Sequence, residues 1–299
     1  MPYFSIILPT YNRAHLLPKS IQSVMVQTFK DWELIIVDDG STDDTKAVVK
    51  NFQDERIRYI YQENQERSAA RNNGVNQAKG KYICFLDSDD YFLEKKLEHF
   101  HEAIHGQEPT RLFYDALAFE TAGKLGSFHL PLKGKEETMH EFLLMNPLGA
   151  LQFCIPLSVL QQEQFNPSLR VGEDVELWLR LANNYELIAV KSNNTVAVEH
   201  DERSVNLIKY NSGLDQLKQL EYIFMQYDFI LISKRIRKKV LSNCQFNISK
   251  YFMFNGEKLH ASKWLIKSIF TDVKNLQFKH RLYCVLNLTI IRIPKEYRI

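Results

Sequence analysis

Cysteine is scarce in this chain of 299 residues, and long apolar runs are absent. The four cysteines lie far apart with no paired spacing, at Cys84, Cys154, Cys244 and Cys284. This spacing argues against a zinc ribbon, a redox motif and a disulfide framework, and it favours a reduced compartment. No run approaches the ~20 apolar residues of a membrane-spanning helix. The N-terminus enters a strand-like segment without a basic leader or a cleavage tripeptide, so we expect a cytoplasmic protein.

The composition that is present suits a large folded body with a basic end. Apolar residues make up 45% and charged residues 25% of the chain, which is enough for one large domain or one domain with an appendage. The net charge of +2 hides an asymmetry, because residues 230–299 hold 15 Lys and Arg against 3 Asp and Glu, whereas residues 1–229 hold 23 against 33. We expect the basic end to meet a negative surface: anionic lipid, nucleic acid or the chain's own acidic body.

Short apolar runs alternate with helical spacings through the first ninety residues. The pattern predicts strands at residues 4–8, 34–37, 57–61 and 82–86, and helices at residues 16–27, 45–52 and 68–78. Strands that alternate with helices indicate a parallel, doubly wound sheet, whose ligand crevice lies beyond the C-terminal ends of the strands. Residues 10–13, 38–44 and 87–90 are therefore expected along one rim.

The pattern loosens from residue 111 onward. We predict strands at residues 112–119, 150–155 and 196–199, a helix after Thr138 and another at residues 173–183, then helices at residues 214–229, 239–254 and 257–270. This division predicts a body of residues 1–210, with halves of about 1–110 and 111–210, and a basic helical extension of residues 211–299. No low-complexity linker separates them, so the extension is expected to pack on the body.

The strongest single feature is Leu86-Asp87-Ser88-Asp89-Asp90, with three carboxylates in four positions at the end of a predicted strand. Clustered carboxylates repel one another unless a cation lies among them. Mg²⁺ or Mn²⁺ takes one or two such oxygens together with diphosphate oxygens and waters, so the sequence predicts a site for a metal-bound nucleotide. The alternative is an acidic turn that caps the next helix.

A second acidic turn, Asp38-Asp39-Gly40-Ser41-Thr42-Asp43, ends another predicted strand on the same rim. Ordinary turn and cap chemistry is again the alternative. Two acidic strand ends on one edge, joined by Thr10 and the aromatic Tyr11, describe a pocket for a base, a ribose and a metal-bridged diphosphate. Arg71 could add a phosphate or carboxylate contact through its planar guanidinium.

Four motifs occur together in the order and spacing of a known family: Ser5-Ile6-Ile7-Leu8-Pro9-Thr10-Tyr11-Asn12-Arg13, Val37-Asp38-Asp39-Gly40-Ser41-Thr42-Asp43, Ala69-Ala70-Arg71-Asn72 and Leu86-Asp87-Ser88-Asp89-Asp90. Over residues 2–205 the chain resembles the family 2 inverting glycosyltransferases. The resemblance implies the GT-A (Rossmann-like) α/β fold, a doubly wound mixed sheet, here with a C-terminal helical extension. It also implies transfer of a hexosyl or N-acetylhexosaminyl group from a nucleotide-diphosphate donor, a UDP-sugar, to a glycan or lipid-linked acceptor in cell-surface polysaccharide or glycoconjugate synthesis.

The resemblance further implies roles for individual residues. It assigns the donor to Pro9, Thr10, Tyr11, Arg13, Asp39, Arg71, Asp87 and Ser88, and a Mn²⁺ or Mg²⁺ ion to Asp89 and His200. Many relatives place a histidine or arginine at the position of His200, although a surface histidine is the alternative. One departure stands out, because many relatives have a glycine where this chain has Glu66-Arg67 after Asn64-Gln65.

The catalytic base is expected in Glu173-Asp174, just before a predicted helix. In the family the aspartate of this pair takes the proton from the acceptor, so Asp174 inherits that role and Glu173 a supporting one. The alternative is an acidic first turn favoured by the helix dipole. Trp178, one turn further on, could stack on the acceptor sugar, and core packing is its alternative.

The basic end and the rival functions remain open from the sequence. Residues 234–239 and 280–299 combine Lys and Arg with apolar residues, which suits peripheral contact with an anionic leaflet at the inner face of the membrane, or the solvent side of packed helices. Nucleic acid is a poorer partner, since the aromatic spacing of single-strand binders is missing. The rival functions are an inactive partner subunit and a sugar nucleotidyltransferase. A sugar nucleotidyltransferase would have a glycine-rich phosphate loop after the first strand. This chain has no such loop, because no glycine precedes Gly40.

Overall fold

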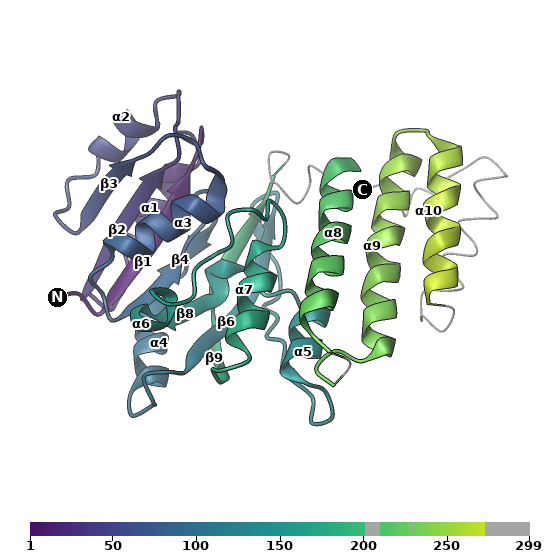
Figure 1. Cartoon of the computed structure of the whole chain (residues 1–299). Helices are drawn as coiled ribbons and strands as arrows, with labels where there is room; N and C mark the ends of the chain where they lie inside the picture. Colours follow the sequence, from purple (N-terminus) through teal and green to yellow (C-terminus); the bar gives the residue numbers. More distant parts are fainter. Residues whose placement is uncertain (201–209, 229, 273–299) are drawn as a thin grey trace. The chain divides into compact units, whose positions relative to one another are not determined.

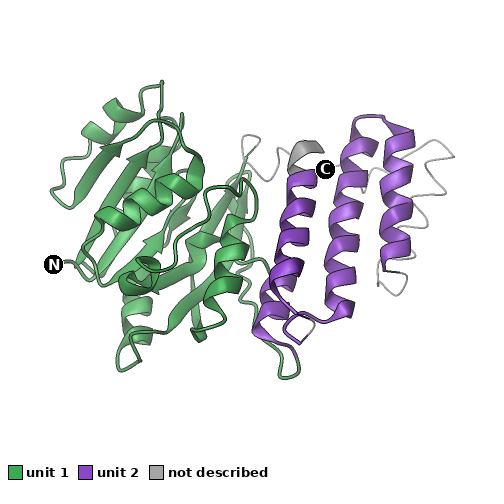
Figure 2. Ribbon diagram, viewed as in Figure 1, with its two compact units in different colours: residues 1–136, 146–203 green, residues 137–145, 204–299 purple. Residues whose placement is uncertain are grey.

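The computed structural model describes residues 1–200, 210–228 and 230–272, and the predicted basic segment 280–299 lies outside them. The chain forms two compact units (Figure 2). Unit 1 consists of Met1–Glu136 and Asn146–Arg203, and unit 2 of Glu137–Met145 and Ser204–Ile299. A short segment from the middle of the sequence, residues 137–145, therefore groups with the C-terminal helices.

Unit 1 is built on one nine-stranded mixed sheet with the order β3-β2-β1-β4-β8-β6-β9-β5, and β7 pairs with β6. The strands are β1 (Phe4–Thr10), β2 (Trp32–Asp38), β3 (Ile57–Tyr61), β4 (Tyr82–Phe85), β5 (Tyr91–Phe92), β6 (Leu112–Thr121), β7 (Lys124–Leu125), β8 (Phe153–Pro156) and β9 (Leu187–Glu199). The pairs among β1 to β4 are parallel, whereas β8 runs antiparallel to both β4 and β6. The predicted doubly wound mixed sheet is confirmed.

Burial explains the strands and helices of the first half. Ile6, Ile7 and Leu8 in β1 are all fully buried, as expected for a parallel strand covered on both faces. In the first helix Leu17, Ile21 and Val24 share one buried face. The helical segments of unit 1 are α1 (Leu17–Met25), α2 (Thr45–Lys50), α3 (Glu66–Gln77), α4 (Lys96–Ile104), the 3₁₀ turn η1 (Ala150–Gln152), α6 (Leu157–Leu160) and α7 (Glu173–Leu181).

Sequence analysis was less accurate in the second half of unit 1. No helix was predicted for α4, the strand predicted at residues 150–155 begins as η1, and the strand predicted at residues 196–199 is the far longer β9. Polar residues interrupt the first part of β9, yet Ser192, Asn194 and Thr195 are buried. Hydrogen bonds to other parts of unit 1 satisfy these groups, and a hydrophobicity pattern does not record such bonds.

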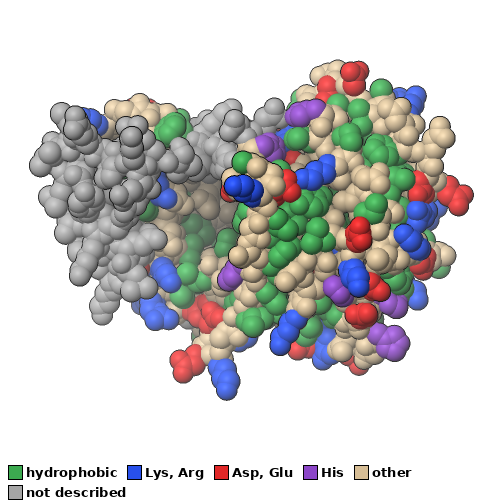
Figure 3. All heavy atoms as spheres, turned by 180° about the vertical axis from the view of Figure 1, so that it is seen from behind, with side chains coloured by type: hydrophobic (Ala, Val, Ile, Leu, Met, Phe, Trp, Pro, Cys, Tyr) green, Lys and Arg blue, Asp and Glu red, His purple; other side chains and the backbone are tan. Residues whose placement is uncertain are grey.

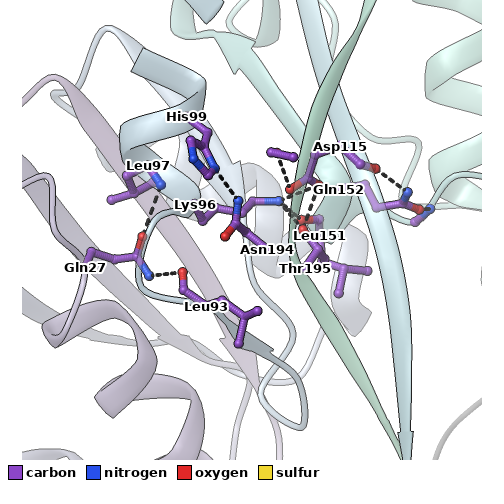
Figure 4. Close-up of polar contacts among 12 residues, drawn as sticks. Gln27, Leu93, Lys96, Leu97, His99, Asp115, Leu151, Gln152, Asn194 and Thr195 are labelled. Atoms are coloured by element: carbon purple, nitrogen blue, oxygen red, sulfur yellow. Dashed lines mark hydrogen bonds and ion pairs between the residues drawn. The ribbon is translucent and has the colours of Figure 1, made fainter. Parts of the chain in front are cut away.

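A fully buried ion pair, Lys96 with Asp115, provides hydrogen-bond partners for some of these buried polar residues (Figure 4). Lys96 Nζ donates to Asp115 Oδ1 at 2.9 Å and to the carbonyl oxygen of Leu151 at 3.0 Å, and it also contacts the Thr195 hydroxyl. Thr195 Oγ1 donates to Asp115 Oδ1 at 2.7 Å. Burial raises the pKa of Asp115, and the Lys96 ammonium opposes that effect. The pair therefore joins α4, β6 and β9 inside the core.

Gly74 allows α3 to approach the sheet closely. A Cβ atom at this position would lie 2.4 Å from Ile7 Cγ2 and 3.2 Å from Val37 Cγ2. We expect Gly74→Ala to lower the free energy of unfolding by about 1–3 kcal/mol, because overpacking a filled core outweighs the ~1 kcal/mol that alanine gains in helix propensity. Urea denaturation measures the change, with the exposed Gln77→Ala on α3 as the control. A stabilised Gly74→Ala variant would contradict the close packing.

Unit 2 consists of α5 (Met139–Met145), α8 (Tyr210–Gln226), α9 (Lys234–Phe254) and α10 (Lys258–Thr271). The last three run side by side, with α9 between the other two (Figure 1). Helix α9 begins at a true cap, since Ser233 Oγ accepts from the backbone N–H of Ile236. The helices predicted after residue 210 are present. In the ranges that the structure covers, none of the helices has the length and apolar character to cross a bilayer.

Charged side chains of both signs are mixed over the face of unit 1 that Figure 3 presents. The excess of acidic over basic residues before residue 230 therefore does not form one continuous negative area on that face. In unit 2 the start of α9 exposes Lys234, Arg235 and Lys238. The predicted membrane contact stays a prediction.

Candidate active site

The three motif-bearing strands end at one edge of the sheet, as predicted. Thr10 at the end of β1 lies beside Asp38 at the end of β2, and the N–H of Asp39 donates to the carbonyl oxygen of Thr10 at 2.9 Å. The N–H of Leu86, just after β4, donates to the carbonyl oxygen of Ile7 at 2.9 Å. Parallel pairing thus brings the two acidic turns next to the turn that carries Tyr11.

The first acidic turn holds its two carboxylates differently. Asp38 supports the turn itself, since it accepts from the N–H of Ser41 at 2.8 Å and from the Tyr59 hydroxyl. Asp39 Oδ1 accepts from the N–H of Gln65 at 2.9 Å and from Gln62 Nε2 at 2.7 Å. Burial raises the pKa of Asp39, although these hydrogen bonds lower it in part. Asp39 therefore fastens the loop before α3 to the rim.

Two groups of the first motif suit a ligand. Tyr11 exposes 48% of its surface although it lies on the rim, so its ring is open to stacking. Thr10 Oγ1 is buried and has no hydrogen-bond partner within the described part of the chain. A buried hydroxyl without a partner is unfavourable by about 1–3 kcal/mol, so a ligand that supplied a partner would be favoured here.

The second acidic turn is braced from two sides. Ser20 Oγ, on α1, donates to the carbonyl oxygen of Ser88 at 3.0 Å and to that of Asp90 at 2.7 Å. Asp90 Oδ1 accepts from the N–H of Val198 at 2.8 Å, which joins the turn to the end of β9. Sequence analysis missed Ser20, because one serine within a helical spacing carries no signal that distinguishes it from solvent-facing residues.

Asp89 lies where three distant parts of the chain meet. Its Oδ2 atom lies 3.0 Å from Arg13 Nη1 and 3.0 Å from His200 Nε2. The predicted metal residues Asp89 and His200 are thus in contact, and the donor residue Arg13 joins them. Over the residues described, no cluster of three or more His, Cys, Asp or Glu side chains could enclose a metal ion.

The available donor set nevertheless fits a divalent ion that arrives with its substrate. Mg²⁺ and Mn²⁺ are held in nucleotide sites by one or two protein ligands, with phosphate oxygens and waters completing the shell. The Asp89 carboxylate and the His200 imidazole supply two such ligands, and imidazole is acceptable to Mn²⁺.

Arg71 connects the donor rim to α7. Its Nη1 atom lies 2.9 Å from Glu173 Oε1 and its Nη2 atom 2.9 Å from Asp87 Oδ1, and the residue is only 3% exposed. The guanidinium predicted to contact the donor therefore bridges two carboxylates that are 86 positions apart in the sequence. This bridge positions Glu173, and with it Asp174, beside the second acidic turn.

Asp174 is the second residue of α7. The helix follows Gly172, which lies in the left-handed region at φ 71°. Its Oδ1 atom accepts from the N–H of Val175 at 2.8 Å. Burial and the neighbouring Glu173 carboxylate raise the pKa of Asp174 to about 7, against the opposing charges of Arg71 and Arg67. Such a carboxylate can exchange a proton near neutral pH, as a general base must.

The acceptor prediction for Trp178 is wrong. The indole is fully buried, stacks on Phe153 with ring centroids 3.9 Å apart and donates from Nε1 to the carbonyl oxygen of Leu148 at 2.9 Å. With both its ring face and its polar atom engaged in the core, it has no surface left for a sugar. The core alternative is correct, because the indole lies one helical turn deeper than Asp174 and packs against the ring of Phe153 in β8.

Glu66 explains the departure at the start of α3. It has φ 71°, a left-handed conformation that favours glycine, the residue of many relatives here. The loop reaches this conformation because the N–H of Gln65 is directed at Asp39. Glu66 therefore carries a charged side chain on a backbone conformation that glycine adopts without strain.

A mixed sheet with acidic turns beyond β2 and β4, and a carboxylate at the start of α7, is the architecture of GT-A glycosyltransferases. The model of the family described as "Glycosyl transferase family 2" matches residues 5–125. The UDP-Glc:alpha-D-GlcNAc-diphosphoundecaprenol beta-1,3-glucosyltransferase WfgD of Escherichia coli is 32% identical over 62% of this chain and 72% of its own length. The chain belongs to glycosyltransferase family 2.

Two further similarities extend over most of the chain. An uncharacterized glycosyltransferase of Rickettsia felis is 26% identical over 96% of this chain and 48% of its own length, so the chain spans about half of that relative. The crystal structure of S. aureus TarS 1-349 in complex with UDP-GlcNAc superposes with a TM-score of 0.64 at 18% identity, over 91% of this chain and 81% of that one. The second similarity shows a shared fold.

Proposed function

We propose that the chain is an inverting glycosyltransferase that moves a sugar from a UDP-sugar to a glycan or lipid-linked acceptor in cell-surface polysaccharide or glycoconjugate synthesis. The observation that carries the proposal is the Arg71 bridge, which holds Asp87 of the donor rim and Glu173 beside Asp174 at 2.9 Å each. Membership of family 2 supports it, and so does the acceptor in the name of the Escherichia coli relative, a sugar on diphosphoundecaprenol.

The donor lies along the rim in this proposal. Tyr11 stacks on the base, and Thr10 Oγ1 and Asp39 bond the base and ribose, with Pro9 shaping the turn. Asp87 and Ser88 contact the ribose side of the diphosphate, and Arg13 and Arg71 supply positive charge near it. Asp89 and His200 would hold a Mn²⁺ or Mg²⁺ ion, which when bound neutralises charge that develops on the leaving diphosphate.

Asp174 activates the nucleophile in this proposal. The acceptor hydroxyl oxygen forms a bond to the anomeric carbon on the face opposite the diphosphate, the bond from that carbon to the diphosphate oxygen breaks, and Asp174 accepts the hydroxyl proton. Glu173 supports the base indirectly, because its ion pair with Arg71 fixes the start of α7. Configuration inverts in this single displacement, so no covalent enzyme intermediate forms.

The pKa of Asp174 predicts the pH dependence of the reaction. Only the ionised carboxylate can accept the proton, and below its pKa of about 7 the ionised fraction falls about tenfold per pH unit. We expect log(kcat/KM) to rise with slope one up to about pH 7 and then level off. Initial rates of UDP release from pH 5 to 9 measure the profile. A rate that is constant down to pH 5 would remove Asp174 from the role.

Two measurements test the proposed function against its alternatives. Calorimetric titration with UDP and Mn²⁺ reports donor-site binding, and turnover of a panel of nucleotide sugars reports activity. Tight UDP binding without turnover on any donor would indicate an inactive partner subunit. Formation of a nucleotide sugar from a nucleoside triphosphate and a sugar phosphate would indicate a sugar nucleotidyltransferase.

We also propose that the protein works in the cytoplasm, peripherally at the inner face of the membrane. The exposed Lys234, Arg235 and Lys238 at the start of α9 support this, because each basic side chain near an anionic surface contributes about 1 kcal/mol. Sedimentation with anionic vesicles at low salt tests it, and a protein that stays in the supernatant would contradict it.

A further inference from the structure

The Arg67 and Arg170 side chains make no hydrogen bond within the described residues. The Arg67 side chain is 44% exposed and that of Arg170 74% exposed. Their nearest carboxylate oxygens lie at 3.8 Å, in Glu173, and at 3.9 Å, in Glu66, both beyond hydrogen-bond length. Neither guanidinium donates a hydrogen bond to any residue of the ranges described above. Each therefore presents its planar set of donors to solvent.

Both arginines border the proposed base. Arg67 Nε lies 3.8 Å from Glu173, the residue before Asp174, and its charge is among those that oppose the raised pKa of Asp174. Arg170 lies four residues before Asp174 in the chain, and its guanidinium reaches Glu66, the residue before Arg67. Arg67, in the first turn of α3, and Arg170, in the loop before α7, thus lie on two segments that approach each other through the pairs Arg67–Glu173 and Arg170–Glu66.

The donor rim does not need these two charges. Asp87 and Glu173 are already paired with Arg71, and Asp89 with Arg13. Arg67 and Arg170 are two further guanidinium groups, and the described residues accept none of their N–H donors. A phosphate would engage these donors through paired N–H···O bonds, more strongly than a neutral sugar would.

The strained Glu66 points the same way. Glu66 is a non-glycine residue in the left-handed region, which is unfavourable by about 1–3 kcal/mol, and such strain persists only where the surrounding structure enforces it. The side chain kept here is a carboxylate 3.9 Å from Arg170 Nε, close enough to hold that guanidinium near Arg67 and too far to saturate it. An incoming anion can replace so loose a contact.

We propose that Arg67 and Arg170 form a phosphate-binding subsite for the acceptor, so that the attacking sugar carries a phosphate or diphosphate group. The inference rests on the proposed function and names its substrate class.

The test measures binding of inorganic pyrophosphate by calorimetry, with UDP present to fill the donor diphosphate site and no metal added. We expect Arg67→Gln with Arg170→Gln to weaken pyrophosphate binding about tenfold or more, as the loss of charge-assisted hydrogen bonds implies. Arg67→Lys with Arg170→Lys keeps the charge and should retain part of the affinity. Arg111→Gln is the matched control, since Arg111 pairs with Glu186 just before β6, at the opposite edge of the sheet.

UDP affinity, measured in a separate titration with Mn²⁺ on the same proteins, separates the two proposals. Unchanged UDP binding in the double variant, together with lost pyrophosphate binding, supports the subsite. Equal pyrophosphate binding by wild type and double variant, or none by wild type, overturns the subsite even where UDP binds. Failure of the wild type to bind UDP contradicts the proposed function and leaves the pyrophosphate comparison to decide the subsite.

Turnover then distinguishes the two sources of the phosphate. N-acetylglucosamine 1-phosphate tests a soluble sugar phosphate, and N-acetylglucosaminyl-diphospho-undecaprenol in detergent tests a lipid-linked acceptor. With the acceptor that is used, the double variant should raise the acceptor KM about tenfold or more and leave the donor KM unchanged. Faster transfer to unphosphorylated N-acetylglucosamine than to both phosphorylated forms would overturn the proposal.

Discussion

Asp174→Asn is expected to lower kcat by about 10²–10⁴-fold while donor affinity stays within about twofold. Asparagine has nearly the same shape and keeps an oxygen for the N–H of Val175, now bonded at 2.8 Å, but it cannot accept the proton of the hydroxyl. Donor contacts come from β1, β2 and β4 in the proposal, so they should be insensitive to the change. Rates at saturating donor and acceptor, with calorimetric UDP binding, measure the two effects separately.

The control for this variant is Asp44→Asn, which removes an exposed carboxylate at the start of α2. It should leave both kcat and UDP affinity unchanged. Unaltered turnover in Asp174→Asn would contradict the assignment of the base. Joint loss of turnover and UDP binding would instead assign Asp174 to the structure of the site, through its position beside the Arg71 bridge.

Lys96→Met is expected to lower the free energy of unfolding by about 3–5 kcal/mol. Both members of the Lys96–Asp115 pair are completely buried, so the substitution leaves a carboxylate in the core without its counter-ion. Methionine fills a similar volume between the rings of Phe92 and Phe100, each 4.7 Å from the ammonium, so lost packing contributes little. Urea denaturation monitored by tryptophan fluorescence measures the loss.

A double variant separates charge from packing in this cluster. Lys96→Met with Asp115→Leu removes both charges, and we expect it to recover a large part of the lost stability. Lys19→Met is a surface control, because Lys19 pairs with Glu120 at 2.8 Å in an exposed setting, and we expect a change below about 1 kcal/mol. A Lys96→Met variant as stable as Lys19→Met would show that the buried pair is dispensable.

The cluster also links stability to the site. It fastens β9 to α4 and β6, and the end of β9 supplies the Val198 N–H that holds Asp90. His200 follows directly and meets Asp89. The second acidic turn is therefore held through a strand whose position depends on a buried charge pair.

The parts of the fold that could be predicted from sequence are those whose signals are local. Strand β1 is an apolar run that ends at a turn, and α1 shows its buried face as a regular spacing. The acidic turns follow β2 and β4, and parallel pairing alone places them at one edge. The first half of β9 could not be found in this way, because its buried polar residues look like a loop until their partners are known.

The sequence by itself determined the order of strands and helices from β1 to β4, the acidic turns at the strand ends and the family, because the signal for each lies in residues that are close together in the chain. Tertiary structure alone decided that Trp178 packs in the core, that Arg71 joins Asp87 to Glu173, and that Arg67 and Arg170 have no hydrogen-bonded partner in the described chain. Those outcomes depend on contacts between residues that are far apart in the sequence, and such contacts form only when the chain folds.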